Sequence, residues 1–357
     1  MQGFRSHWWK ALGAILVLYS IYLGTSTEVG PGVVRVTPDN VSANSSFEVQ
    51  IEGYNTHFKD HYDPKEGGVH VWYKVLGKLQ KAKEVKVVDA NHLLARFDGV
   101  NLNTDTSFVR SGTIVIEDVH HGMFLGSKML ALHFDKNAEA GLDSLENASV
   151  VPQKRDQAYF SFPYRYLLYE TIRNLNFHVP MWFTMIVILL ISFIYSISHL
   201  NTGKRVYDIR ANAFAKVGLL FGLMGIATGM FWANYAWGTP WTKDPKLNGA
   251  AVGVLMYIAY QILRGSIDDE GKVARISAVY NVLAFPIFIV LIIVLPRLAE
   301  FSLHPGAGDS VGFSTYDLNN HLRKVFYPAV LGWILVGAWV SQLTARIDKL
   351  INDKEWK

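Results

Sequence analysis

The stretch VPMWFTMIVILLISFIYSI, at positions 179–197, contains no Asp, Glu, Lys or Arg. A bilayer core about 30 Å thick is crossed by an α-helix of about 20 apolar residues. A helix also satisfies its own backbone hydrogen bonds, which lipid cannot do. The stretch is therefore predicted to cross a membrane as a helix.

Five more runs without those four residue types lie elsewhere in the chain. They are Ala11–Leu23, Val217–Trp232, Ala250–Leu263, Ile276–Leu295 and Val325–Leu343. Burial in the core of a soluble protein is the alternative, but six such runs with charges confined to their ends favour a membrane protein. We therefore expect a polytopic α-helical membrane protein with six transmembrane helices.

The charge is unevenly distributed along the 357 residues. Lys plus Arg is 34 and Asp plus Glu is 30, a net charge of +4. Residues 28–170 carry −4 and the rest of the chain carries +8. A charge of +4 is too small to indicate nucleic-acid binding, so no nucleic-acid partner is expected. The absence of cysteine excludes a disulfide scaffold, a Cys-ligated metal site and haem attachment through Cys-x-x-Cys-His.

The short connections between the runs set the expected orientation. Thirteen Lys and Arg residues fall on the side of the two termini and six on the other side. Because cytoplasmic loops carry the positive excess, both termini are predicted to be cytoplasmic and residues 28–175 to lie outside. Residues 1–27 form the first predicted transmembrane helix. A cleaved signal peptide over residues 1–24 is the alternative, but Trp8 and Trp9 favour a retained membrane anchor.

Residues 28–160 have a different pattern, with short alternating stretches between turn residues. Strands are predicted at 33–36, 47–51, 69–73, 84–88, 92–97 and 111–116. This spacing favours an all-β sandwich inserted after the first helix. The residues 36–40 and 47–55 resemble the first strands of immunoglobulin-like TIG modules, so an immunoglobulin-like extracytoplasmic domain is expected. Its histidines, including the pair His120 and His121, are interpreted as surface residues rather than ligands, because neighbours on a strand point to opposite faces.

Three features are predicted to meet at the outer ends of the helices in residues 161–357. His178 lies where the second run begins, and Pro180 suits the first turn of a helix there. The connection from 231 to 248 is rich in aromatic residues, and His304 lies between the last two runs. An aromatic belt alone does not require two histidines beside it. A flat apolar macrocycle with a central iron does, because indole faces bury the ring and imidazoles ligate the metal.

Residues 165–345 resemble the haem-handling membrane proteins of cytochrome c maturation (CcmC type), which share a tryptophan-rich outer loop. The matching pieces are Phe177-His178-Val179-Pro180, Trp237-Gly238-Thr239-x-Trp241-x-x-Asp244 and His304. The resemblance implies that His178 and His304 are axial ligands of haem b, and that Trp237, Trp241 and Asp244 form a platform for it. Pro240 and Lys243 stand where the family usually has Trp; Lys243 or Lys246 is expected to pair with a haem propionate, and Arg173 is a further candidate.

The same resemblance implies a function. The protein would bind haem at the periplasmic face of the bacterial inner membrane and deliver it to a periplasmic haem chaperone. Subunits of an ATP-binding-cassette complex would be partners, together with membrane lipid, and the protein itself would not be an enzyme. Two alternatives stay open: a haem lyase or synthase that attaches haem to apocytochrome c, and a membrane-anchored receptor or adhesion protein working through its β-domain. An ion transporter is disfavoured because the runs contain no acidic residue.

Overall fold

The computed structural model describes residues 7–61, 68–75, 78–100, 106–118, 120–135, 166–299, 304 and 320–355. The chain divides into two compact units. One comprises Met1–Ser26 with Thr171–Lys357 and is helical, and the other comprises Thr27–Glu170 and is rich in strands. The β-unit is therefore inserted in the sequence after the first helix.

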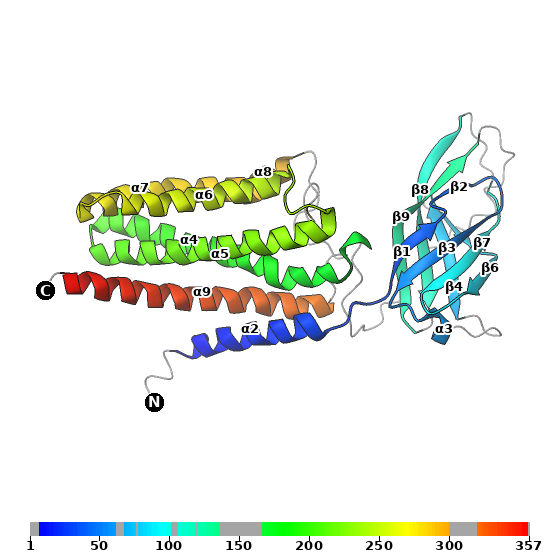
Figure 1. Cartoon of the computed structure of the whole chain (residues 1–357), viewed down its shortest axis with the longest axis horizontal. Coiled ribbons are helices and arrows are strands. Elements are labelled where there is room, and N and C mark those ends of the chain that lie inside the picture. The colour runs from blue at the N-terminus through cyan, green and yellow to red at the C-terminus, as the bar shows by residue number, and fades with distance from the viewer. Residues whose placement is uncertain are drawn as a thin grey trace. The chain divides into compact units, whose positions relative to one another are not determined.

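The β-unit consists of two sheets around one hydrophobic core (Figure 1). The four-stranded sheet has the order β1-β3-β7-β6, with bounds Gly32–Thr37, Phe47–Tyr54, His92–Phe97 and Glu84–Val87. The five-stranded sheet has the order β2-β9-β8-β4-β5, with bounds Asn40–Ser42, Gly122–Phe134, Phe108–Asp118, Val69–Val75 and Lys78–Lys81. Alternate side chains such as Val49, Ile51, Val71 and Tyr73 are fully buried between the sheets, as expected for strands with one face on a core.

All six predicted strands are present, and three strands were not predicted. The missed strands are β2, β5 and β9, of which β9 is the longest in the described part of the chain. Glycines at both its start and its middle, Gly122 and Gly126, hid it in the sequence, because glycine is unfavourable in strands. The short helix α3 (Phe58–His61) was also missed. The immunoglobulin-like assignment remains a prediction.

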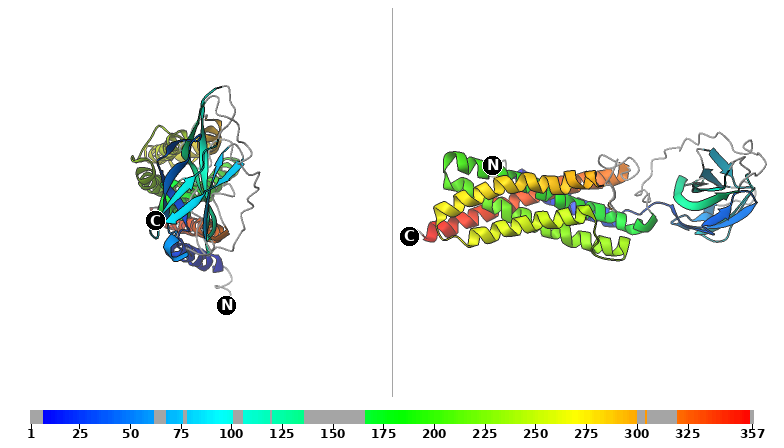
Figure 2. Two further views of the ribbon diagram at one scale, coloured as in Figure 1. Left: turned by 90° about the vertical axis from the view of Figure 1, so that its right-hand side faces the viewer. Right: turned by 90° about the horizontal axis from the view of Figure 1, so that it is seen from above.

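The helical unit contains seven described α-helices and two irregular segments. The α-helices are α2 (Trp8–Ser26), α4 (Leu175–Thr202), α5 (Arg205–Trp237), α6 (Pro245–Gly265), α7 (Glu270–Ile289), α8 (Leu295–Leu298) and α9 (Asn320–Glu355). The 3-10 segment η2 (Tyr166–Asn174) leads into α4, and the π-helical segment η3 (Val290–Val294) joins α7 to α8. The bundle is built around the antiparallel pair α4 and α5 (Figure 2).

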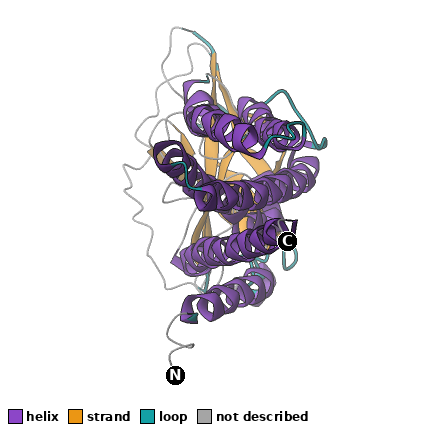
Figure 3. Ribbon diagram, turned by 90° about the vertical axis from the view of Figure 1, so that its left-hand side faces the viewer, coloured by secondary structure: helices purple, strands orange, loops and turns teal. Residues whose placement is uncertain are grey.

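Five of these helical stretches are long and apolar enough to cross a membrane. They are Glu170–Thr202, Arg205–Trp237, Pro245–Gly265, Glu270–Leu298 and Asn320–Ile351. The prediction of six transmembrane helices is thus confirmed for five, and α2 is not among them. The α2 helix packs along α9, where Gly13 lies against Leu335 and Gly332 lies against Leu16. The start of α2 and the end of α9 lie at the same end of this bundle (Figure 1), which Figure 3 shows end-on.

A stripe of glycines on α5 allows α4 to pack closely against it. Each glycine faces one large side chain of α4: Gly218 faces Leu189, Gly222 faces Met185, Gly225 faces Trp182 and Gly229 faces His178. A Cβ atom at any of the four would lie 2.5 to 2.8 Å from that side chain. Small residues that let two backbones approach are typical of helix contacts in membranes. The last pair of this series places His178 at the C-terminal part of α5.

Candidate functional site

His178 lies in the first turn of α4, because that helix begins at Leu175 rather than near Pro180 as expected. Its Nδ1 is 3.0 Å from Thr228 Oγ1, and Thr228 Oγ1 is 2.8 Å from the carbonyl of Met224. The threonine has one hydroxyl proton, which it donates to that carbonyl, so its oxygen accepts from the imidazole. This network assigns the proton of neutral His178 to Nδ1 and the lone pair to Nε2.

The imidazole of His178 is held from two sides. A Cβ at Gly229 would lie 2.8 Å from His178 Cε1, so only glycine leaves room for the ring there. Trp182, one turn further along α4, meets the imidazole edge-on at 6.3 Å between ring centroids. The position of the ring is therefore fixed by the packing of α4 on α5.

His304 packs against two indole rings of α5. Its ring centroid is 5.8 Å from that of Trp232 and 5.1 Å from that of Trp237, and the two indoles are 5.0 Å apart. Trp232 follows Gly229 by three residues, and residues at this spacing share one face of a helix. Adjacent turns of α5 thus hold His178 and His304, and the two imidazoles lie within electrostatic reach of each other.

Asp244 links His304 to the start of α6. Its carboxylate is buried, with a side-chain exposure of 0%. Asp244 Oδ1 lies 3.1 Å from His304 Nδ1 and also accepts hydrogen bonds from the backbone of Lys246 at 2.9 Å and Leu247 at 3.4 Å. A carboxylate only accepts, so His304 donates from Nδ1 and its lone pair is on Nε2. Histidines that bind metals generally donate their other N–H to such a partner, which orients the ring.

The predicted tryptophan-rich loop at 231–248 is shorter in the structure. Residues up to Trp237 belong to α5 and those from Pro245 belong to α6, so the loop itself spans 238–244. The aromatic spacing concealed this boundary, because a helix and an interfacial loop tolerate tryptophan equally well. Gly238 ends α5 with a φ of +72°, in the left-handed region that glycine adopts readily. The loop therefore turns sharply and returns the chain to Asp244.

The structure separates the predicted site residues into two groups. Trp237 and Asp244 contact His304 directly, and His178, on α4, packs against the neighbouring turn of α5. Trp241 is exposed, and its indole donates to Asn248 Oδ1 at 3.3 Å. Lys243 is exposed, whereas Lys246 lies within electrostatic reach of His178. The guanidinium of Arg173 donates to the carbonyls of Gly24 and Thr25 at the end of α2.

Thr228 and Gly229 were not predicted as part of the site, and Trp232 was predicted only as a member of the aromatic-rich loop 231–248. A signal for them was present, because glycines at 218, 222, 225 and 229 recur at helical spacing and mark the contact face of α5. Trp232 extends that face by one turn.

The donor set fits an iron porphyrin. Two imidazoles lie at one end of the bundle, each with Nδ1 bonded to the protein, and indole rings and the cation Lys246 lie near them. Arg297 lies within electrostatic reach of Lys246. The described residues contain no group of three or more His, Asp or Glu that could hold a metal ion. A porphyrin needs only axial ligands from the protein, because its macrocycle supplies the others. The arrangement therefore suits haem better than a metal ion bound by protein side chains alone.

A protein-family model matches the helical part of the chain. Residues 148–348, more than half of the chain, match the family model of "CcmC: Heme exporter protein C". The match contains both α5 and the site residues His178, Trp237, Asp244 and His304.

Individual relatives cover smaller parts. Heme exporter protein C of Bradyrhizobium diazoefficiens is 33% identical over 110 residues, covering 30% of this chain and 41% of the relative. Heme exporter protein C of Rhodobacter capsulatus is 28% identical over 162 residues, covering 45% of this chain and 64% of the relative. Cytochrome c biogenesis protein CcsA of Thermosynechococcus vestitus is 41% identical over 68 residues, covering 18% of this chain and 21% of the relative. The chain thus spans between about two fifths and two thirds of the heme exporter relatives.

Proposed function

The chain belongs to the heme exporter protein C family, and on this basis we propose that it binds haem b and hands it on for cytochrome c maturation. The observation that carries the proposal is the pair of imidazoles, those of His178 and His304, that pack against adjacent turns of α5. Both donate from Nδ1, His178 to Thr228 and His304 to Asp244. Nε2 of each ring is then the atom that would ligate the iron of the haem.

Each residue of the site has a distinct task in this proposal. The bound group supplies a ligand-accepting iron and two propionates. His178 and His304 ligate, Asp244 and Thr228 orient them, and the indoles of Trp232 and Trp237 cover the apolar ring. Lys246 and Arg297 pair with propionates, and Lys243, at the exposed surface, contributes less. Gly238 allows the turn that brings Asp244 to His304.

Handing on requires a site that releases its cargo. Asp244 and His304 come from two separate connections between helices, and both lie at the bundle end where α5 finishes. We propose that this end faces the periplasm of the bacterial inner membrane, with both termini in the cytoplasm and α2 as a sixth spanning helix. The recipient is a periplasmic haem chaperone, with subunits of an ATP-binding-cassette complex as partners. The β-unit, predicted to span 28–160, then lies in the periplasm as an immunoglobulin-like docking domain.

The test is haem binding by the full chain in lipid nanodiscs. One equivalent of ferric haem should give a low-spin bis-imidazole spectrum in the wild type. The double variant His178→Ala, His304→Ala should lose that spectrum, whereas His321→Ala, which removes another imidazole of the helical unit, should keep it. A low-spin bis-imidazole spectrum that persists in the double variant would overturn the assignment, as would a wild-type chain that binds no haem.

A second candidate function is haem attachment to apocytochrome c. It is favoured by the similarity to proteins named cytochrome c biogenesis protein CcsA, which covers 18% of this chain for the relative from Thermosynechococcus vestitus. The two functions differ in their product. Conversion of added apocytochrome c to the holo form by the purified chain and haem would favour attachment, and haem transfer to a chaperone without it would favour delivery.

A further inference from the structure

The π-helical turn η3 leaves one backbone carbonyl without its regular partner. In a π turn each N–H bonds to the carbonyl five residues back, and such turns are frequent at functional sites. Here the N–H of Leu295 donates to the carbonyl of Val290. The carbonyl of Leu291 would need the next N–H at that spacing, but residue 296 is Pro296, which has none. The Leu291 carbonyl is therefore left without a π-helical hydrogen bond.

This carbonyl lies against α6 at Gly249, which is buried. A Cβ atom at Gly249 would collide with the carbonyl oxygen of Leu291. That oxygen belongs to a planar peptide unit, so it cannot rotate away as the end of a side chain can. Only glycine therefore allows the backbones of α6 and η3 to approach each other at this point.

Both sides of this contact lead to His304. On one side, Gly249 lies on α6 shortly after Asp244, whose carboxylate caps that helix and accepts a hydrogen bond from His304. On the other side, η3 continues into α8, which ends six positions before His304 in the sequence. Lys246 and Arg297, one from each side, lie within electrostatic reach of each other. The contact thus sets the spacing between the start of α6 and the end of α8.

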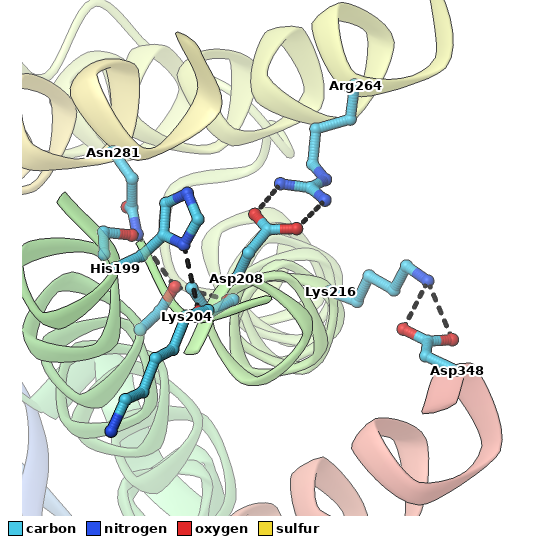
Figure 4. Close-up of polar contacts among 10 residues, drawn as sticks. His199, Lys204, Asp208, Lys216, Arg264, Asn281 and Asp348 are labelled. Carbon is cyan, nitrogen blue, oxygen red and sulfur yellow. Dashed lines mark hydrogen bonds and ion pairs between the residues drawn. The ribbon is translucent and has the colours of Figure 1, made fainter. Parts of the chain in front are cut away.

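The middle of α7 is anchored by hydrogen bonds, whereas η3 is not buried. Asn281 donates to the hydroxyls of Ser192 and Ser196 on α4 at 2.9 Å each, and it accepts from Tyr257 on α6 at 3.2 Å (Figure 4). No residue of η3 is buried. A displacement of η3 is therefore taken up toward α8 rather than in the anchored part of α7.

Ion pairs hold the helices at the end of the bundle where α5 begins. Each pair starts from α5 and reaches a different helix: Asp208 with Arg264 of α6, Lys216 with Asp348 of α9, and Arg205 with Glu270 of α7. Asp208 and Arg264 share two bonds, of 2.7 and 2.9 Å (Figure 4). Because α6 is fixed at this end, it cannot retreat as a whole from η3.

We propose that Gly249 and η3 position His304, by setting where the chain leaves α8 toward this imidazole. The inference rests on the proposed function, in which His304 is an axial ligand of haem. Gly249 is a positioning residue, since it acts through His304 and not on the haem itself. His178 is positioned separately, by Gly229 and Thr228 of α5. A fault at η3 should therefore remove one axial ligand and leave the other.

The test is Gly249→Ala in the full chain, in lipid nanodiscs loaded with ferric haem. The added methyl group pushes η3 away from α6, so the low-spin bis-imidazole spectrum should give way to a high-spin spectrum. Haem affinity should fall about ten- to a hundredfold, as for the loss of a group that orients a ligand. Free imidazole in the buffer should restore the low-spin spectrum, because it fills the axial position that His304 has left.

Gly253→Ala is the matched control on the same face of α6. Its Cβ would lie 2.6 Å from the ring of Phe288 on α7, so it also disturbs the packing of α6 on α7. This disturbance lies before η3, and the low-spin spectrum should persist. Equal loss of that spectrum in both glycine variants would overturn the role of η3.

A double-mutant cycle identifies the imidazole through which Gly249 acts. In a His304→Ala background, Gly249→Ala should lower haem affinity less than about twofold, because the ligand it positions is already absent. In a His178→Ala background, the loss should be about ten- to a hundredfold again. Equal losses in the two backgrounds would contradict the proposal.

Pro296→Ala tests the same element by a milder change. It supplies an N–H for the carbonyl of Leu291, which draws that carbonyl away from α6, so part of the low-spin spectrum should be lost. Where Gly249→Ala does not fold, the spectrum of Pro296→Ala decides. An unchanged low-spin spectrum in both variants overturns the positioning role and leaves the proposed function intact. A wild type without a bis-imidazole spectrum overturns the proposed function instead.

Discussion

The two ends of the helical unit use their polar side chains for different purposes. Where α5 ends, the carboxylate of Asp244 accepts a hydrogen bond from the imidazole of His304, and this imidazole packs against the indole of Trp237. Where α5 begins, Asp208 forms an ion pair with Arg264 of α6. The same residue type therefore orients a histidine at one end and joins two helices at the other. The difference teaches that burial of a carboxylate alone does not reveal its role; its partner does.

The largest effect of a single substitution is expected on the free energy of unfolding, at the end of the bundle where α5 begins and where the ion pairs lie. Asp208→Asn leaves the guanidinium of Arg264, whose side chain is 13% exposed, without its counter-charge. Removing one partner of a buried pair costs about 3–5 kcal/mol. The free energy of unfolding, measured by denaturing-detergent titration, should fall by this amount, with bis-imidazole haem binding retained in the folded protein. Lys216→Gln is the control: its lysine is 42% exposed, so the loss should stay below about 1 kcal/mol. Equal losses would contradict the contrast between these two pairs.

At the other end, Asp244→Ala should affect binding more than stability. Loss of the partner that orients a ligating histidine typically costs about ten- to a hundredfold in affinity, and loss of the helix cap costs about 1 kcal/mol of stability. Haem affinity and unfolding are measured on the same samples. Asp244→Asn keeps an oxygen acceptor, so it should lose less haem affinity and less stability than Asp244→Ala. If the two variants were equally impaired, the hydrogen bonds of this oxygen would not be the cause.

Substitution of the two tryptophans of the family motif, Trp237 and Trp241, should affect haem binding to different extents. Trp237 contacts His304, whereas Trp241 donates to Asn248 and is 38% exposed. Trp237→Ala should weaken haem binding about tenfold, the effect of roughly 1.4 kcal/mol for a lost aromatic contact. Trp241→Ala should change it less than about threefold. A larger loss for Trp241 would show that the loop 238–244 rearranges when haem binds.

The smallest effect is expected for the lysines. Lys246→Met should weaken haem binding about two- to fivefold through loss of a charge pair with a propionate. Lys243→Met, a change of the same size at the exposed neighbouring position, should have no measurable effect. The comparison is made by haem titration in low salt and again in high salt, where the difference should shrink.

The sequence predicted the helices better than their ends. Charge-free runs locate α4, α5 and α9, but α5 extends beyond Val217–Trp232 at both ends, to Arg205 and Trp237. Polar residues at helix ends reach water and leave no break in the pattern, so hydropathy could not mark these ends. The same limit placed Trp237 in a loop and His178 before its helix.

The site was predictable in its residue types but not in its contacts. His178, His304 and Asp244 stood out through their spacing around the tryptophans. The partner of Asp244 is 60 residues distant, and Arg264 is 56 residues from Asp208. Which carboxylate meets which partner depends on how the helices pack. That packing follows from the glycine stripe on α5, a pattern that apolar runs alone do not display.

Asp244 both caps α6 and accepts a hydrogen bond from His304, and this has a consequence for hydrogen exchange. The amide hydrogens of Lys246 and Leu247 bond to the same carboxylate oxygen that holds His304. Exchange of these two amides with solvent requires the first turn of α6 to open. The same opening releases the imidazole from its orientation. These amides therefore report the opening of the site on the timescale of exchange, and ligation of His304 should slow them while leaving the amides at the far end of α6 unchanged.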